Sequence, residues 1–359
     1  MHLQELKLYN FKNFSQEYFK FDHKINCFVG NNGVGKTNIL DAIYFLALGK
    51  SYFNNNIRQI IKFNEQAFSI NGLFKIDNEA EAIHISYQLD KKKTIKRNNK
   101  VYSRLADHIG LIPLVMISPY DRDLISESGE TRRKFIDKII SQADVQYLNT
   151  LINYQKVLMQ RNRLLKYFAA NHKFDRETLS IYNQQLHEYG QIIYQKRTDF
   201  INEFAIYLKE KYQILSQGKE VINITYDTAL QKKNLIDLLN ENIQKDRILQ
   251  HTSQGIHRDD FLFEIHDKPI KKFGSQGQQK SYLIALRLAE FEFLKQKSEQ
   301  IPILLFDDVF DKLDESRVEQ IVKMVNDETF GQIFISDTHA QRTENLVKKT
   351  HQSFKIFNL

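Results

Sequence analysis

Residues 30–37, GNNGVGKT, decide the fold of this chain. They match G-x-x-x-x-G-K-[ST], the P-loop pattern in which glycines let the backbone approach a phosphate and direct its N–H groups toward it. Such a loop needs a strand before it and a helix after it. The apolar run at residues 25–29 and the helical spacing of residues 38–48 meet this requirement. The predicted phosphate-binding residues are Gly30, Asn31, Asn32, Gly33, Val34, Gly35, Lys36 and Thr37.

A second motif, ILLFDD at residues 303–308, is an apolar strand that ends in two acids, the Walker B arrangement. Asp307 and the hydroxyl of Thr37 are expected to ligate Mg²⁺. Asp308 stands where a general base could orient the attacking water, and Lys36 is expected to reach the outer phosphates. Alone, the motif would be an ordinary strand with an acidic turn. Its presence beside a P-loop favours the catalytic interpretation.

Residues 275–278, SQGQ, open a predicted helix and place a serine and a glycine at its N-terminus, where anions bind favourably. Alone, this would be a capped helix. Its position before the Walker B strand resembles the signature loop of ABC ATPases, in which one subunit completes the nucleotide site of another. The resemblance implies that two molecules enclose two ATPs, with these residues acting in trans: Ser275, Gln276, Gly277 and Gln278.

Two later segments stand where ABC proteins carry further nucleotide-site elements. Asp311 and Asp314 occupy the position of the D-loop. Thr338 and His339 follow a predicted strand, at the position of the switch residue that touches the γ-phosphate. For His339, a solvated turn explains the sequence equally well.

Composition limits the remaining possibilities. The chain has 359 residues, 42% hydrophobic and 26% charged, which is typical of a globular protein of about two domains. A single cysteine, Cys27, excludes an internal disulfide and a thiolate metal cluster. No apolar run reaches the ~18 residues of a membrane span, and the N-terminus lacks a signal-peptide pattern. We therefore expect a cytoplasmic protein without a membrane partner. Its net charge of +7 permits a polyanionic one.

The periodicity of the apolar residues predicts the domain organisation. Strand-like segments occupy both ends of the chain, with turns expected at residues 77–78 and 98–99. Residues 130–189 contain neither Gly nor Pro, and helical spacing runs to Phe168, breaks at residues 169–176 and resumes to Tyr207. This pattern predicts two long antiparallel helices. The predicted architecture is α/β, an ABC-type P-loop ATPase head built from residues 1–120 and 251–359, with a helical arm domain inserted at residues 121–250.

Longer segments restrict the resemblance from ABC ATPases in general to one family. Residues 8–14, 30–51, 118–137, 255–265, 275–290 and 304–317 resemble the RecF family, in that family's order and over essentially the whole chain. Two of these segments distinguish the RecF family from generic ABC ATPases, which lack them: residues 118–137 and 255–265. The short helical region also suits RecF, since SMC-like relatives carry coiled coils of hundreds of residues. Tyr52 and Phe53 depart from the His-Arg that often follows GKS in the family.

The resemblance implies a function. RecF-like proteins are ATP- and Mg²⁺-dependent DNA-binding proteins of recombinational repair that dimerise on ATP. They bind double-stranded DNA, including duplex next to single-stranded gaps, and with RecR and RecO they help load RecA. Their ATP hydrolysis is weak, depends on DNA and resets the dimer. These properties are expectations for this chain, together with an association with the nucleoid.

Three groups of basic residues could neutralise DNA phosphates without reading sequence. For any single one of them, a solvated face is the favoured explanation. The first lies in a predicted hairpin, the second at the base of the insertion and the third near its tip. They are Lys91, Lys92, Lys93, Lys96, Arg97, Lys100 and Arg104, then Arg132, Arg133, Lys134 and Lys138, and finally Arg161, Arg163 and Lys166.

Three other functions remain open from the sequence. A head-only relative of another SMC-like ATPase would share most of the motifs. A P-loop phosphotransferase acting on a small molecule would have a closed monomeric site, and it leaves the SQGQQKS segment unexplained. The ATPase subunit of a membrane transporter usually has no long helical arm between its nucleotide motifs.

Overall fold

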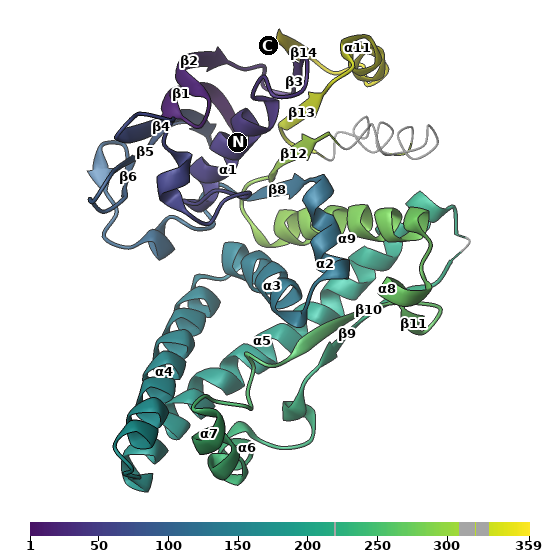
Figure 1. The fold of residues 1–359 in the computed structure, drawn as a ribbon. Coiled ribbons are helices and arrows are strands. Elements are labelled where there is room, and N and C mark those ends of the chain that lie inside the picture. Colours follow the sequence, from purple (N-terminus) through teal and green to yellow (C-terminus); the bar gives the residue numbers. More distant parts are fainter. Residues whose placement is uncertain (219, 309–319, 321–329) are drawn as a thin grey trace. The chain divides into compact units, whose positions relative to one another are not determined.

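The computed structural model describes residues 1–218, 220–308, 320 and 330–359, which form two compact units (Figure 1). The first unit contains Met1–Asp121 and Leu286–Leu359, and the second contains Arg122–Ala285. The first domain boundary was expected near residue 120, and the two units divide between Asp121 and Arg122. The second was expected near residue 250, but the chain stays in the second unit through Ala285. No helix within the described residues combines the length and hydropathy needed to cross a membrane.

A five-stranded parallel sheet joins the two ends of the chain in the first unit. Four of its strands are fully buried and read as nearly continuous apolar runs, whereas the edge strand at the end of the chain is partly exposed. Figure 1 shows the purple N-terminal strand β3 beside the yellow C-terminal strands. The sheet order is β14 (Phe354–Asn358), β3 (Ile25–Val29), β13 (Ile333–Asp337), β12 (Ile303–Asp307) and β8 (Leu114–Ile117).

The first unit also contains an antiparallel sheet, whose inner face packs on helix α1 (Lys36–Leu48). Side chains alternate between this apolar face and a polar outer face, as period-two strands require. Both expected turns are confirmed, with positive φ angles at Asp77 and Asn78 and at Asn98 and Asn99. The strands are β2 (Phe14–Lys20), β1 (His2–Phe11), β4 (Ala67–Ile76), β5 (Glu79–Gln88), β6 (Thr94–Arg97) and β7 (Lys100–Val101).

Two long antiparallel helices, α4 (Val145–Ala170) and α5 (Arg176–Ser216), dominate the second unit (Figure 1). Asp175 caps α5, as its sequence position favours, by accepting hydrogen bonds from the N–H groups of Glu177 and Thr178. The first predicted helix is interrupted, because Asp144 adopts an extended conformation and caps α4. The preceding residues form a separate helix, α3 (Gly129–Ala143).

A small antiparallel sheet explains the second boundary. Strand β10 (Asp260–Ile265) pairs with β9 (Ile222–Asp227) and with β11 (Lys268–Pro269), so the segment after residue 250 is held in the second unit. Helix α9 (Gln276–Lys297) contains the division between the units. The other α-helices among the described residues are α2 (Asp123–Ser126), α6 (Leu235–Glu241), α7 (Ile243–Leu249), α8 (Ile270–Phe273) and α11 (Ala340–Lys348).

A buried arginine holds the end of the arm together. Arg161 of α4 has no exposed surface and donates to Asp246 of α7 at 2.8 Å, to Asn183 of α5 at 2.7 Å and to Thr252 at 2.8 Å. The expectation that Arg161 neutralises DNA phosphates is therefore wrong. Its hydrogen bonds, made through Nε and Nη1, join three segments of the second unit to α4.

Asp246→Ala should lower the free energy of unfolding by about 3–5 kcal/mol, because it leaves the Arg161 charge buried without its partner. Urea unfolding followed by circular dichroism measures this loss. Arg163→Ala, two residues along the same helix but exposed, is the matched control and should change stability by less than ~0.5 kcal/mol. Equal losses in the two variants would contradict the structural role of the Arg161 cluster.

Candidate nucleotide-binding site

The P-loop connects the end of β3 to the start of α1 and closes around the lysine that the sequence singled out. The Lys36 ammonium donates to the carbonyl oxygens of Gly30 at 2.7 Å and Asn31 at 2.9 Å. Gly35 has a φ of 114°, and a Cβ there would lie 2.6 Å from the side chains of both Asn13 and Phe14. Only glycine therefore fits at this position. The loop keeps an open backbone with the lysine inside it.

Asn13 supports the loop from the turn between β1 and β2. Its amide nitrogen donates to the carbonyl of Val34 at 3.1 Å, and its amide oxygen accepts from Asn38 of α1 at 2.7 Å. This role was not predicted, because the segment at residues 8–14 carried only a family resemblance. The only signal in the sequence was a polar residue at a strand turn. Its partner, Val34, lies more than twenty positions away and could not be recognised.

The carboxyl ends of β12 and β13 meet the P-loop at one edge of the parallel sheet. The Thr37 hydroxyl donates to Asp307 Oδ1 at 2.8 Å, and the Ser336 hydroxyl donates to the same oxygen at 2.8 Å. The structure thus brings together the two residues predicted to ligate Mg²⁺. The sequence motifs assigned no role to Ser336. Its position at a strand end was the signal.

Burial raises the pKa of Asp307 above its ordinary value, since the side chain is only 3% exposed. The hydrogen bonds from Thr37 and Ser336 lower that pKa, and the charge of Asp308 raises it. The donor set is a carboxylate and a hydroxyl, the hard oxygen ligands that suit Mg²⁺. Mg²⁺ usually keeps several waters, so it does not require a cage of protein ligands. No group of three or more metal-ligating side chains was found among the described residues.

Asp308 follows directly and is fixed through its backbone. Its φ is 46°, and its N–H donates to the hydroxyl of Ser336 at 3.0 Å and to the carbonyl of Ser336 at 3.3 Å. A left-handed conformation is uncommon outside glycine and is kept only where surrounding contacts enforce it. Asp311 and Asp314, predicted for the D-loop, lie outside the described residues.

Thr338 and His339 leave the sheet at the same edge and begin α11. The Thr338 hydroxyl lies 2.8 Å from His339 Nδ1, and the His339 N–H donates to the buried carboxylate of Asp337. Arg342 and Thr343 also donate to Asp337. The two predicted switch residues are therefore held at the edge where the P-loop begins, and the His339 side chain is exposed.

The predicted signature loop starts α9 with a reciprocal capping arrangement. The Ser275 hydroxyl accepts from the N–H of Gln278 at 3.2 Å, while the Gln278 side chain accepts from the N–H of Ser275 at 2.7 Å. Gln278 also donates to Glu220 at 2.8 Å. Ser275 and Gln276 are exposed, and Gly277 is partly exposed. The expected helix is confirmed, and its N-terminal residues remain accessible to an anion.

Tyr52 lies inside a buried polar network of the first unit. Its hydroxyl donates to Asp121 at 2.6 Å and accepts from Arg287 of α9 at 2.9 Å, while Arg287 also pairs with Glu290. Burial raises the pKa of Tyr52 well above its usual value. Its backbone N–H donates to Asp41 of α1. This departure from the family pattern therefore has a structural role.

Two of the basic residues in the hairpin region are engaged within the fold. Arg97 makes a two-pronged ion pair with Glu81, at 2.8 and 2.7 Å, and Lys93 is half-buried, with its ammonium on the carbonyl of Gly49. Burial lowers the pKa of Lys93. The Lys93 ammonium is therefore held within the fold, whereas the Arg97 side chain is still 42% exposed and its contact with DNA stays a prediction. Lys91, Lys92 and Lys100 are exposed, and Lys96 is half-exposed on the outer face of the sheet.

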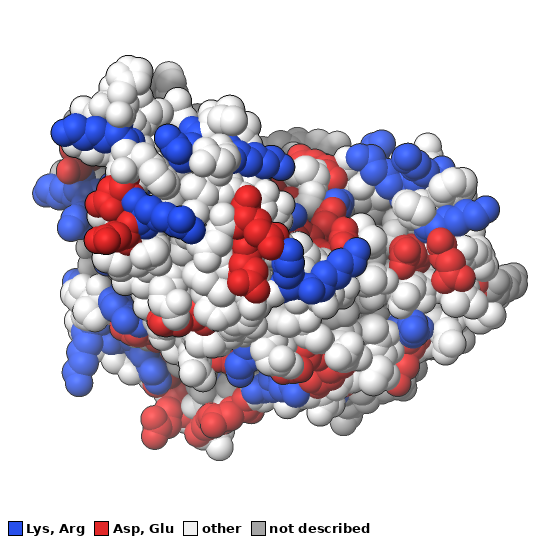
Figure 2. Space-filling view, turned by 90° about the horizontal axis from the view of Figure 1, so that it is seen from below, with Lys and Arg blue, Asp and Glu red and all other residues white. Residues whose placement is uncertain are grey.

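The charged surface is mixed where it can be seen. In the coloured part of Figure 2, Lys and Arg side chains stand among Asp and Glu side chains and broad uncharged areas. The described residues on this face thus form no field of one sign. Any DNA contact must therefore be argued from particular side chains.

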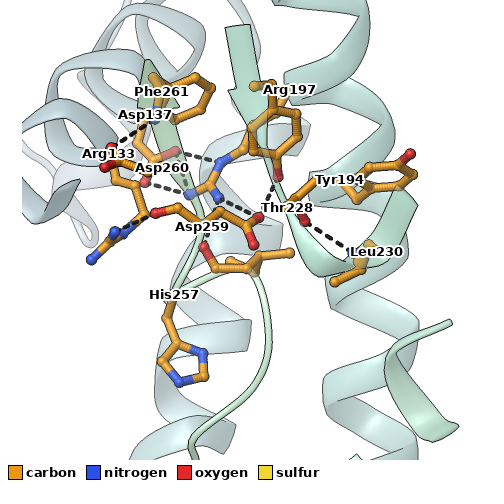
Figure 3. Close-up of polar contacts among 12 residues, drawn as sticks. Arg133, Asp137, Tyr194, Arg197, Thr228, Leu230, His257, Asp259, Asp260 and Phe261 are labelled. Atoms are coloured by element: carbon orange, nitrogen blue, oxygen red, sulfur yellow. Dashed lines mark hydrogen bonds and ion pairs between the residues drawn. The ribbon is translucent and has the colours of Figure 1, made fainter. Parts of the chain in front are cut away.

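Arg132 and Arg133, predicted as DNA contacts, are both engaged in polar contacts of the second unit, and Figure 3 shows Arg133 among them. Arg132 makes a two-pronged pair with Asp260, both bonds 2.8 Å long, and Arg133 donates to the carbonyl of Asp259. In the same cluster Arg197 of α5 pairs with Asp137. The two segments that discriminate the family, residues 118–137 and 255–265, therefore meet here.

Known proteins with similar sequences identify the family of this chain. The family model of the RecF/RecN/SMC N terminal domain matches residues 2–358. The DNA replication and repair protein RecF of Flavobacterium johnsoniae is 60% identical over all of both chains. The chain belongs to the RecF family. RecF of Bacteroides fragilis strain ATCC 25285 is 43% identical, over 100% of this chain and 96% of the relative.

Solved structures agree with the RecF assignment. The recombination mediator protein RecF-ATP of the RecFOR pathway is 30% identical, with a TM-score of 0.88, over 94% of this chain and 92% of that one. An Smc head bound to the C-winged helix domain of ScpA is 16% identical, with a TM-score of 0.56, over 96% and 92%. The second likeness concerns the fold alone. The prediction of an ABC-type head with an inserted helical arm is thus confirmed.

Asp307→Asn should stabilise the nucleotide-free protein at pH 7 by about 0.5–1 kcal/mol, because the amide still accepts from Thr37 and Ser336 but carries no buried charge. The folded-state pKa of Asp307 is raised. Below the unfolded-state pKa the carboxyl is protonated in both states, and the contribution of Asp307 to stability is complete. That contribution is lost as the pH rises through the folded-state pKa, because the buried carboxyl must then ionise. The advantage of the variant should therefore shrink toward about pH 4.

Thermal unfolding between these pH values measures the difference. Asp307→Ala is the matched control: it removes the acceptor of two hydroxyls and should destabilise the protein. An Asp307→Asn variant less stable than the parent at pH 7 would refute the burial argument.

Proposed function

We propose that this chain is an ATP-dependent DNA-binding protein of recombinational DNA repair. The observation that carries the proposal is the 2.8 Å hydrogen bond from Thr37 to Asp307, which joins the P-loop to the Walker B strand. Two further findings support it. The chain shares 60% identity with a DNA replication and repair protein RecF, and a RecF-ATP structure has the same fold.

The chemistry follows from the residues at the edge of the parallel sheet. The P-loop N–H groups and Lys36 would hold the phosphates of ATP. Thr37 and Asp307 would hold Mg²⁺, which when bound supplies positive charge to neutralise the phosphates. Asp308 would orient the attacking water as general base, and Thr338 or His339 would respond to the terminal phosphate. We propose that hydrolysis is weak and stimulated by DNA.

A second copy of the chain would complete the site. Gln276, Gly277 and Gln278 begin α9, a helix of 22 residues whose N-terminus favours an anion, and Ser275 immediately precedes it. In the proposed ATP-bound homodimer these residues contact the terminal phosphate held by the partner P-loop. Asp311 and Asp314 would serve as the D-loop between the copies. Hydrolysis then separates the dimer.

The proposed DNA ligand is duplex next to a single-stranded gap. Lys91 and Lys92, in the turn between β5 and β6, and Lys100 of β7 are exposed and supply the charge for phosphate contacts. The proposed partners are RecR and, through it, RecO in the loading of RecA. The proposed location is the cytoplasm, at the nucleoid. The name RecF and the RecFOR pathway of the relatives support these partners.

Asp308→Asn should trap ATP and prolong the dimer, because the water would lack its base. Light scattering with and without ATP and Mg²⁺ measures the mass, and the measurement is then repeated with gapped duplex DNA. The expected result is a dimer that forms only with ATP and then holds DNA. Ser275→Arg is the matched control: it should bind ATP but remain monomeric.

A monomer that binds ATP but neither pairs nor binds DNA would contradict the proposal and favour a small-molecule phosphotransferase. An ATP-dependent dimer without affinity for DNA would favour another head-only SMC-like ATPase.

Lys91→Glu together with Lys92→Glu should weaken duplex binding about tenfold or more near 100 mM salt and lower the salt slope by roughly 2, because two phosphate contacts are lost. Fluorescence anisotropy across a salt series measures both quantities. Lys232→Glu with Lys233→Glu, which are also exposed, makes the same change in net charge and should leave binding nearly unchanged. Equal effects of the two pairs would exclude a specific role for the turn.

A further inference from the structure

The outer face of the antiparallel sheet carries two adjacent rows of side chains, each crossing five strands. Their positions follow from the strand register. All ten side chains are exposed or half-exposed, and neither row contains a carboxylate. From β2 to β6 the first row is Tyr18, Lys7, Asn71, His84 and Lys96, and the second is Gln16, Tyr9, Ser69, Ser86 and Thr94.

Two tyrosines project from these rows into solvent. Tyr9 is 52% exposed and Tyr18 is 53% exposed. They are diagonal neighbours on paired strands, which places such side chains about 7–8 Å apart. The core does not require them there, because the opposite face of β1 supplies the buried Leu6 and Leu8. Together with Lys7, Gln16 and Asn71, the rings line a shallow depression of about 770 Å³, whose rim also includes Leu8 and one carboxylate, Glu17.

Exposed aromatic rings beside lysines are the chemistry that binds single-stranded nucleic acid. Unpaired bases stack on such rings with little sequence preference, whereas the bases of a duplex are already stacked. Lys7 Nζ lies 5.4 Å from the centre of the Tyr18 ring. An exposed ammonium–ring contact is weaker than base stacking, so a base could replace this ammonium, which would then reach a phosphate.

The charges on this face complement a polyanion. Lys7 and Lys96 belong to the first row, and Lys20 and Lys75 lie on the same face. Glu5, beside the rows, accepts a hydrogen bond from the Tyr18 hydroxyl. Each row spans four strand spacings, roughly 19 Å at about 4.8 Å each, which gives room for a few nucleotides.

We propose that this face binds a short segment of single-stranded DNA, with Tyr9 and Tyr18 stacked on bases and Lys7 and Lys96 on phosphates. The Asn71 amide oxygen lies 2.6 Å from His84 Nδ1, and its amide nitrogen is the group proposed to meet a base edge. The inference rests on the proposed function in DNA repair at gaps, and it adds a site for the unpaired strand that is distinct from the duplex contacts proposed for Lys91 and Lys92.

The test uses the full chain and a fluorescent dT oligonucleotide of about 12 nucleotides. Tyr9→Ala with Tyr18→Ala should weaken binding about tenfold or more. Tyr9→Phe with Tyr18→Phe keeps both rings and should stay within about twofold of the parent. Lys7→Ala with Lys96→Ala should lower the salt slope by roughly 1–2. Thermal unfolding and ATP binding of the tyrosine variants should be unchanged, because the rings are exposed.

Undiminished dT binding by the alanine pair would overturn the proposal, as would a parent that does not bind dT. A loss in the phenylalanine pair as large as in the alanine pair would rule out stacking. Tighter binding of oligouridylate than of oligo-dT would rule out DNA as the ligand. ATP-dependent duplex binding is measured on the same proteins: its absence in the parent refutes the proposed function, whereas its persistence beside unchanged dT binding refutes this site alone.

Discussion

The parallel pairing of β3 with both β13 and β14 is the constraint on which the rest of the first unit depends. Ile25 is opposite Ile333 on one side and Phe354 on the other, so a strand from the start of the chain lies between two strands from its end. Its backbone groups are buried and need partners on both edges. This pairing directs the P-loop toward the end of β12, and without it Thr37 and Asp307 could not share a hydrogen bond. The nucleotide site is therefore a consequence of how the chain ends meet.

Buried charges fix the second unit in a comparable way. Arg161 and Arg197, which are buried, and Arg132, which is partly exposed, each join a helix to a segment that follows β9, and each has a carboxylate partner. Removing one member of such a pair leaves an uncompensated buried charge, so the arrangement tolerates little displacement. The family-discriminating segments are thus explained by packing as well as by any functional contact: Arg132 lies in one of them and Asp260 in the other.

Local patterns predicted much of this molecule, and distant partners account for what they did not. Strand β3, the hairpin turns and the paired long helices follow from periodicity and turn residues, which act over a few positions. The roles of Arg132 and Arg161 do not, because their partners are 128 and 85 residues away. A sequence displays a positive charge but not the carboxylate that neutralises it. For the same reason Ser336 and Asn13 were missed, while the consecutive residues of the P-loop were found.

The two faces of the antiparallel sheet are under different physical demands. The inner face must pack α1, the helix that begins with Lys36, so its residues are constrained by volume and by the exclusion of water. The outer face contributes little to stability, and surface changes there cost little free energy. Polar and aromatic residues can therefore be selected on it for binding. Because both faces belong to the same strands, one register positions the nucleotide-binding helix and the rows that carry Tyr9 and Tyr18. A ligand held across these rows would bridge the five strands β2, β1, β4, β5 and β6, and would stabilise the sheet on which the P-loop helix rests.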